Sequence, residues 1–173
     1  MTRPTKRTME FYGREDLAAA DALAMLGPAR RASFSSEMDY RDWFVREAMH
    51  DLVPQITGSP VRSYAVEAKV GARLRIDVLA VDARGVRVGF EAKCANLKNP
   101  QTARHHLIQG IGQTLLYHDA LSAQFDSFVP VYLVSDIVPA EVAALMMRHA
   151  LPIGVVEANE ERIVCVGRAI TVQ

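Results

Sequence analysis

Two acidic residues and a lysine stand in neighbouring apolar stretches, and their spacing is the clearest sign of chemistry in this sequence. Asp77 lies in the stretch RIDVL, and Glu91 and Lys93 lie in the stretch FEAKC. Side chains alternate between the two faces of a strand, so Glu91 and Lys93 point the same way, and Asp77 joins them if the stretches pair as a hairpin. Hard divalent cations such as Mg²⁺ bind carboxylate oxygens, and a lysine beside them can steady a phosphate or a nucleophilic water. The three residues therefore indicate a polar site in an otherwise apolar sheet.

Length and composition favour a globular protein with no overall charge. The chain has 173 residues, of which 50% are apolar, and a formal net charge of zero. Nucleic-acid binding would thus have to depend on local basic clusters. Cys94 and Cys165 lie in apolar stretches and are predicted to be reduced core thiols. Residues 1–7 are not followed by the apolar stretch of a signal peptide, and no apolar run is long enough for a bilayer, so we expect a cytoplasmic protein without a membrane partner.

The pattern of apolar residues predicts an N-terminal tail with a short helix in residues 1–35 and a larger domain in residues 36–173. Residues 1–13 are polar and basic and are expected to be poorly ordered. Along the chain, the expected elements are helices at 15–26 and 36–53, strands at 61–70, 74–81 and 86–94, a helix at 102–124, a strand at 128–135, a helix at 139–149, and strands at 153–157 and 162–167. This order predicts an α/β protein with a mixed central sheet flanked by helices.

The motif residues, in this order of elements, resemble the PD-(D/E)xK nuclease superfamily, whose restriction-endonuclease-like core is an αβββαβ unit. Asp77 matches the acid of the second core strand, and Glu91-Ala92-Lys93 matches the E-x-K of the third. Gln113 and Tyr117 match the Q-x-x-x-Y that RecB-type members carry on the next helix. The resemblance, which extends to the cores of Holliday-junction resolvases, covers about residues 36–135.

The resemblance implies a metal site. Asp77 and Glu91 would hold Mg²⁺ or Mn²⁺, with the backbone carbonyl of Ala92 as a further ligand. Glu47 would supply the helical glutamate that many members add, and Glu37 on the same expected helix is its rival. A bound metal of this kind lowers the pKa of a water and neutralises charge on a phosphate.

The resemblance also implies roles around the metal. Lys93 would orient the attacking water or stabilise the transition state, and Gln113 and Tyr117 would position the DNA backbone or support the site. A second E-x-K, at Glu67-Ala68-Lys69, is rejected as the site because no strand bearing an acid precedes it at a suitable spacing. The basic residues expected to contact neighbouring phosphates are Lys98, Arg104, His105, His106, Arg73 and Arg75.

Two functions are compatible with these residues. The first is a metal-dependent DNA phosphodiesterase, either endo- or exonuclease, of a repair, recombination, mobile-element or defence system. The second is an inactive nuclease-fold protein that serves as a nucleic-acid-binding or assembly subunit. The complete set of Asp77, Glu91 and Lys93 favours the first, and the neutral charge favours the second or a partner protein that supplies DNA specificity. A homodimer is a further expectation, with the helix at 15–26 as a candidate dimer element.

Overall fold

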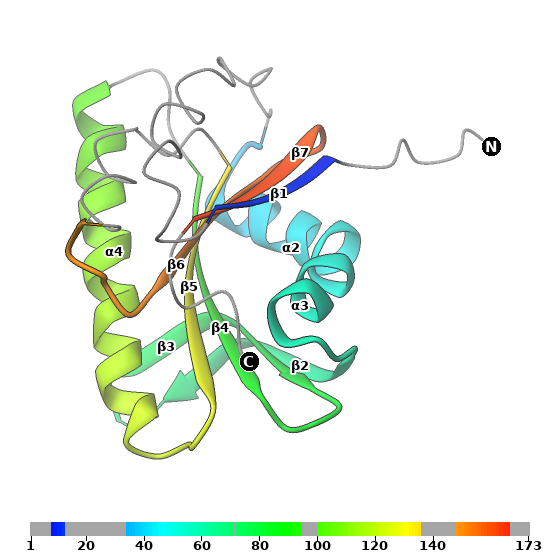
Figure 1. Ribbon diagram of the computed structural model, residues 1–173. Helices are drawn as coiled ribbons and strands as arrows, with labels where there is room; N and C mark the ends of the chain where they lie inside the picture. Colours follow the sequence, from blue (N-terminus) through cyan, green and yellow to red (C-terminus); the bar gives the residue numbers. More distant parts are fainter. Residues whose placement is uncertain (1–7, 13–33, 71, 95–99, 136–147, 167–173) are drawn as a thin grey trace.

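One mixed sheet of seven strands organises the structure, a computed structural model that describes residues 8–12, 34–70, 72–94, 100–135 and 148–166. Its strands are β1 (Thr8–Tyr12), β2 (Val61–Val70), β3 (Leu74–Asp82), β4 (Arg87–Lys93), β5 (Phe128–Val134), β6 (Gly154–Ala158) and β7 (Arg162–Val166). The helices are α2 (Glu37–Glu47), α3 (Met49–Thr57) and α4 (Pro100–Ser122). The strand order is β1-β7-β6-β5-β4-β3-β2. In Figure 1, α4 lies on one side of the sheet and α2 and α3 lie on the other, which confirms the predicted α/β class.

The centre of the sheet follows the predicted pattern closely. Strands β2, β3 and β4 form an antiparallel meander, and β4 then pairs in parallel with β5 after the crossover through α4. The predicted bounds of these elements agree with the observed ones to within about two residues. The meander and the crossover helix place the ends of β3 and β4 beside α4.

The predicted helix at 36–53 is two helices, and its end was predicted wrongly. Ser36 caps α2 as expected, since its hydroxyl accepts the N–H of Asp39 at 3.1 Å. The helix breaks at Ala48, where φ is −128° and ψ is −31°. The chain then continues as α3 through Pro54, and α3 ends at Gly58 with φ +74°. Pro54 lacks an N–H and so removes one helical hydrogen bond, but the buried face of α3 keeps the helix intact.

The N-terminal segment also departs from the prediction. Residues 8–12, expected to be poorly ordered, form β1 and pair in parallel with β7 from Thr8↔Arg162 to Tyr12↔Val166. An edge strand of five residues leaves little periodic signal, and its partner lies at the far end of the sequence. The helices expected at 15–26 and at 139–149 lie outside the described residues, apart from the last two positions of the second. Among the described segments, no helix combines the length and the apolar character needed to cross a bilayer.

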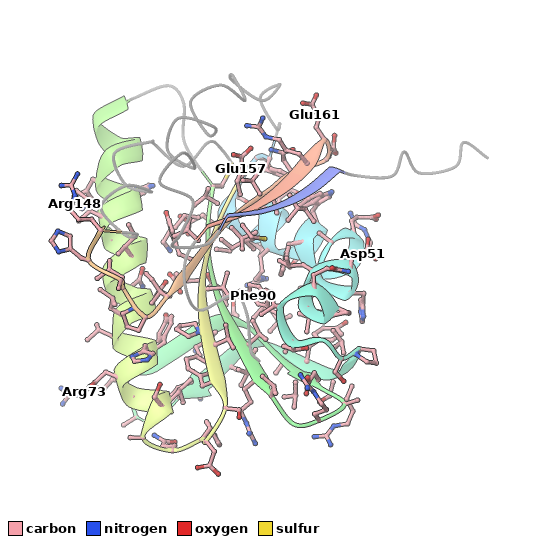
Figure 2. All side chains as sticks on the ribbon, viewed as in Figure 1. Asp51, Arg73, Phe90, Arg148, Glu157 and Glu161 are labelled. Atoms are coloured by element: carbon pink, nitrogen blue, oxygen red, sulfur yellow. The ribbon has the colours of Figure 1, made fainter. Side chains whose placement is uncertain are left out.

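Aromatic packing fixes both helical layers to the sheet. On one face, the rings of Phe44 in α2 and Phe90 in β4 pack with centroids 4.8 Å apart, and Phe90 lies in the interior of the molecule in Figure 2. On the other face, α4 approaches β5 so closely that a Cβ on Gly110 would overlap the ring of Tyr132. The glycine therefore sets how near the helix lies to the strands that carry the polar residues.

Candidate active site

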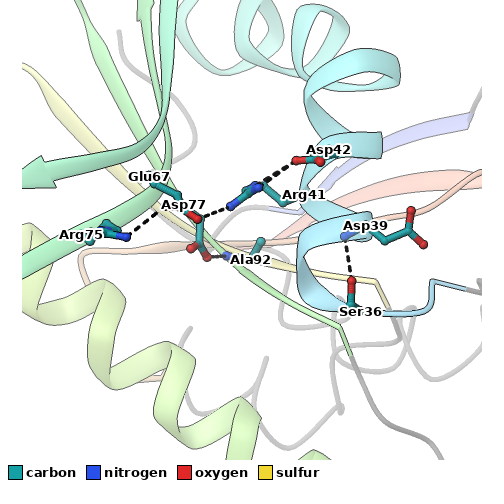
Figure 3. Close-up of polar contacts among 8 residues, drawn as sticks. All are labelled: Ser36, Asp39, Arg41, Asp42, Glu67, Arg75, Asp77 and Ala92. Atoms are coloured by element: carbon teal, nitrogen blue, oxygen red, sulfur yellow. Dashed lines mark hydrogen bonds and ion pairs between the residues drawn. The ribbon is translucent and has the colours of Figure 1, made fainter.

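Asp77 and Glu91 lie where the β3–β4 ladder ends. The last paired residues of that ladder are Val78 and Phe90, so the two acids stand one position beyond it on adjacent strands. The carboxylate of Asp77 accepts the backbone N–H of Ala92 at 2.8 Å (Figure 3). This bond holds the Asp77 side chain against β4, beside the E-x-K.

Glu91 is buried, and both of its carboxylate oxygens have partners. The residue is only 2% exposed. Its Oε1 accepts the Lys93 ammonium at 2.8 Å, and its Oε2 lies 2.8 Å from the Tyr117 hydroxyl. The same hydroxyl lies 2.6 Å from the backbone carbonyl of Arg75. A tyrosine hydroxyl has one hydrogen, so it can donate to one of these acceptors at a time, and a proton on Glu91 would satisfy both contacts.

Lys93 is surrounded by acids from three elements. Its Nζ is 2.8 Å from Glu91 Oε1 in its own strand and 3.5 Å from Glu37 Oε2 at the start of α2. Burial works to lower the pKa of Lys93, but the hydrogen bond that Lys93 donates to Glu91 and the charges of Glu91, Glu37 and Asp77 outweigh it, so the pKa is raised. One ammonium therefore serves as the counterion of three carboxylates.

The pKa values of the Asp77 and Glu91 carboxyl groups are both raised. Burial raises the pKa of Asp77, and the hydrogen bond from Ala92 and the charge of Lys93 offset the increase only in part. Burial also raises the pKa of Glu91, and the neighbouring charge of Asp77 raises it further. Both groups therefore hold protons more tightly than ordinary carboxylates do, mainly because burial disfavours their charged forms.

The donor chemistry of the site fits a hard divalent cation. Carboxylate oxygens are the ligands that Mg²⁺ and Mn²⁺ prefer, and a cation would relieve the repulsion between Asp77 and Glu91. Within the described ranges, no group of three or more His, Cys, Asp or Glu side chains is arranged to hold a metal. A cation held by Asp77 and Glu91 would have to compete with the Lys93 ammonium for Glu91.

The helical acid beside the site is Glu37, not Glu47. Glu37 contacts Lys93 at 3.5 Å, whereas Glu47 pairs with Arg46 at 2.9 Å, and the two glutamates are about equally exposed. Ten residues of helix separate the two glutamates, which is about 15 Å along the axis. The predicted use of Glu47 is therefore replaced by that of its rival, which the Ser36 cap places in the first turn of α2.

Two further polar groups lie on α4. Gln113 stands one turn before Tyr117, and its buried Oε1 has no hydrogen-bond partner within the part of the chain that the structure describes. The buried Nδ1 of His106 is unpaired in the same sense. Buried polar atoms are costly to leave without partners, so these two atoms are available to a water or a ligand. His105 is exposed.

Of the other residues predicted to contact phosphates, the side chains of two are described by the structure and those of two are not. Arg75 is exposed and its guanidinium pairs with Glu67 at 3.0 Å. Arg73 lies in the turn between β2 and β3 and points outward in Figure 2. Lys98 and the side chain of Arg104 lie outside the described residues.

Sequence reasoning missed Arg41 and gave no role to Glu67. Arg41 lies on α2 one turn after Glu37, and its side chain is only 12% exposed. It pairs with Glu67 and with Asp42, each at 3.0 Å (Figure 3). The second E-x-K motif was the sequence feature that could have drawn attention to Glu67. Its lysine, Lys69, is exposed, and only Glu67 contacts a residue near the site, Arg41.

Comparison with known proteins gives no further guide to the site. No protein-family description, curated protein or solved structure matches the chain. Its function must therefore be inferred from its own residues.

Proposed function

We propose that this protein is a metal-dependent nuclease of the PD-(D/E)xK type, which hydrolyses phosphodiester bonds of DNA. The observation that carries the proposal is the gathering of Asp77, Glu91 and Glu37 around the single ammonium of Lys93. A buried Glu91 with two further acids beside one ammonium suits a site that binds a divalent cation. The order of helices and strands from α2 to β5 is compatible with an αβββαβ core.

The residues divide into roles for a hydrolysis of this kind. Asp77 and Glu91 would hold Mg²⁺ or Mn²⁺, which supplies an activated water and neutralises charge on the phosphate. Lys93, released from Glu91 when the metal binds, would orient the water or stabilise the transition state. Tyr117 keeps the Glu91 carboxylate in place through its hydroxyl, and the unpaired Oε1 of Gln113 supports a role for Gln113 in binding a water beside the site.

The proposal is tested by cleavage of labelled single- and double-stranded DNA with Mg²⁺, Mn²⁺ or EDTA. Wild type should cleave with either metal and not with EDTA. Lys93→Ala should lower the turnover by a factor of about 100 or more while DNA binding remains, because Lys93 acts on the transition state. The matched control is Lys69→Ala, since Lys69 ends the other E-x-K and is exposed; this variant should cleave as wild type does. Equal rates for the two variants would contradict the assignment of Lys93.

A second candidate function has an observation in its favour. Both oxygens of Glu91 are already held, by Lys93 and Tyr117, and this closed arrangement suits an inactive nuclease-fold protein that binds nucleic acid or supports an assembly. The same assay separates the two. A wild-type protein that binds DNA, cleaves neither DNA form with either metal, and gains no stability from Mn²⁺ would be of this second kind.

A further inference from the structure

Glu67 adopts a backbone conformation that a glutamate rarely takes. It lies in the middle of β2 with φ +53°, in the left-handed region that favours glycine. Its neighbours Val66 and Ala68 pair regularly with β3, so the irregularity is confined to this one residue. Isolated backbone strain of this kind persists where the surrounding structure holds it and is concentrated at functional sites. With this backbone conformation, the Glu67 carboxylate contacts both Arg41 and Arg75.

That carboxylate lies between two arginines from different elements. Its Oε1 is 3.0 Å from Arg41 Nη1 on α2, and its Oε2 is 3.0 Å from Arg75 Nη1 on β3. Each carboxylate oxygen thus binds a separate guanidinium, as two oxygens of a phosphate can. Figure 3 shows the two guanidinium groups on either side of Glu67. The two arginines form an anion-binding site that Glu67 occupies.

This anion-binding site is joined to the acid cluster on both sides. The backbone carbonyl of Arg75 contacts the Tyr117 hydroxyl, which in turn contacts Glu91. Arg41 stands one helical turn after Glu37, and its charge acts on Asp77. The arginines therefore lie beside the acid cluster, near enough for one nucleic acid to contact both.

The charges make an exchange of anions feasible. Glu67 is 49% exposed and Arg75 is 56% exposed, so solvent reaches the pair and a second anion can approach it. Arg41 is largely buried and keeps Asp42 as a partner when Glu67 leaves. A departing Glu67 would also relieve the strain at its φ angle.

We propose that Arg41 and Arg75 bind a backbone phosphate of the nucleic acid, and that Glu67 occupies this phosphate site until the substrate displaces it. The inference rests on the proposed function in taking nucleic acid as the ligand. It adds a binding residue, Arg41, and gives Glu67 the role of a built-in competitor. Without the Glu67 carboxylate, the two arginines are open to any anion. With it, only an anion that makes more contacts, such as a polynucleotide, displaces Glu67.

The test measures the affinity for fluorescein-labelled single- and double-stranded DNA by anisotropy, in EDTA and across a salt series. Glu67→Gln keeps the size of the side chain and removes its charge, and it should tighten binding about five- to tenfold. Glu67→Gly should do the same, because glycine accepts the φ angle and the carboxylate is gone. Arg75→Gln and Arg41→Gln should each weaken binding and lower the salt slope, by about 0.9 on duplex and about 0.7 on single strands.

The matched control is Glu47→Gln, because Glu47 also pairs with an arginine, is similarly exposed and lies at the other end of α2. It should leave the affinity unchanged, which separates occupation of the phosphate site from a general effect of net charge. The inference is overturned if neither Glu67 variant tightens binding, if Glu47→Gln tightens it equally, or if wild type binds neither form of DNA. DNA that is bound in this pattern but never cleaved would contradict the nuclease proposal alone. Cleavage with unchanged binding in both arginine variants would contradict the phosphate site alone.

Discussion

Two clusters of acidic and basic side chains lie on this sheet, and the ratio of acidic to basic groups differs between them. At the β6–β7 turn, Glu157 is 1% exposed and accepts Arg162 Nε at 2.8 Å and Asn159 Nδ2 at 3.1 Å. Here one acid is matched by one arginine and by the polar groups of a tight turn. At the end of β3 and β4, the ammonium of Lys93 is shared among several acids.

The difference separates a cluster that we interpret as structural from the proposed metal site. A matched and buried ion pair has no electrostatic need for a further ion, and its role is to hold the turn. An acid-rich cluster raises the pKa values of its own carboxyls and is relieved by an added cation. Both clusters contain a buried glutamate, so burial does not distinguish them. The ratio of acidic to basic groups does, and the following experiments test that distinction.

The largest expected effect is on stability, at the matched cluster. Arg162→Ala leaves the Glu157 carboxylate buried without its arginine, which should lower the free energy of unfolding by about 3–5 kcal/mol. Arg46→Ala is the control, because Arg46 forms an exposed pair with Glu47 and should cost about 0–1 kcal/mol. Urea denaturation of both variants measures the difference. Equal and small losses would show that the Glu157 pair does not hold the turn.

The next effect belongs to the acid-rich cluster. Mn²⁺ at about 100 times its dissociation constant should stabilise the wild type by about 2.7 kcal/mol, because the cation binds the folded site and not the unfolded chain. Thermal melts with Mn²⁺ and with EDTA measure this. Asp77→Asn should lose the shift, and Glu37→Gln should reduce it.

Glu47→Gln is the control for the metal site and also decides between the two helical acids. It should keep the full Mn²⁺ shift, because Glu47 lies at the far end of α2 from Lys93. A shift lost in Glu47→Gln and kept in Glu37→Gln would restore the assignment made from the sequence. Equal shifts in wild type and Asp77→Asn would place the metal elsewhere.

The sequence allowed prediction of the parts of the site that lie on strongly periodic elements. Asp77, Glu91 and Lys93 stand among apolar strand residues whose alternation defines their faces, so their convergence followed from local pattern and the expected pairing. Tyr117 was predicted only through the resemblance of Gln113 and Tyr117 to the Q-x-x-x-Y motif of the nuclease family. The structure brings Tyr117 within hydrogen-bond distance of Glu91. Local pattern was sufficient wherever neighbouring strands were also consecutive in sequence.

The remaining features depend on contacts that local pattern does not contain. The choice of Glu37 over Glu47 depends on which end of α2 faces β4, and both glutamates fit the helix equally well. The pairing of Arg41 with Glu67 depends on a single irregular φ angle in β2 and on the packing of α2 against the meander. The pairing of β1 with β7 joins the two ends of the described chain. Each of these is a tertiary contact between segments that have no shared periodicity.

The smallest effect is the pH dependence of the metal-free protein, and its sign follows from the raised pKa values of Asp77 and Glu91. A carboxyl whose pKa is higher in the folded state stabilises the fold below the ordinary value of about 4, and this contribution is lost as the pH rises through the folded value. The loss amounts to about 1.4 kcal/mol for each unit of difference. Asp77→Asn removes one acid and lowers the pKa of the other, so it should flatten the decline in unfolding free energy as the pH rises above about 4. Urea denaturation in EDTA measures both curves, with Asp51→Asn, at an exposed position on α3, expected to follow the wild type. If Asp77→Asn also runs parallel to the wild type, the two carboxylates do not interact, and the contrast with the matched Glu157 cluster fails.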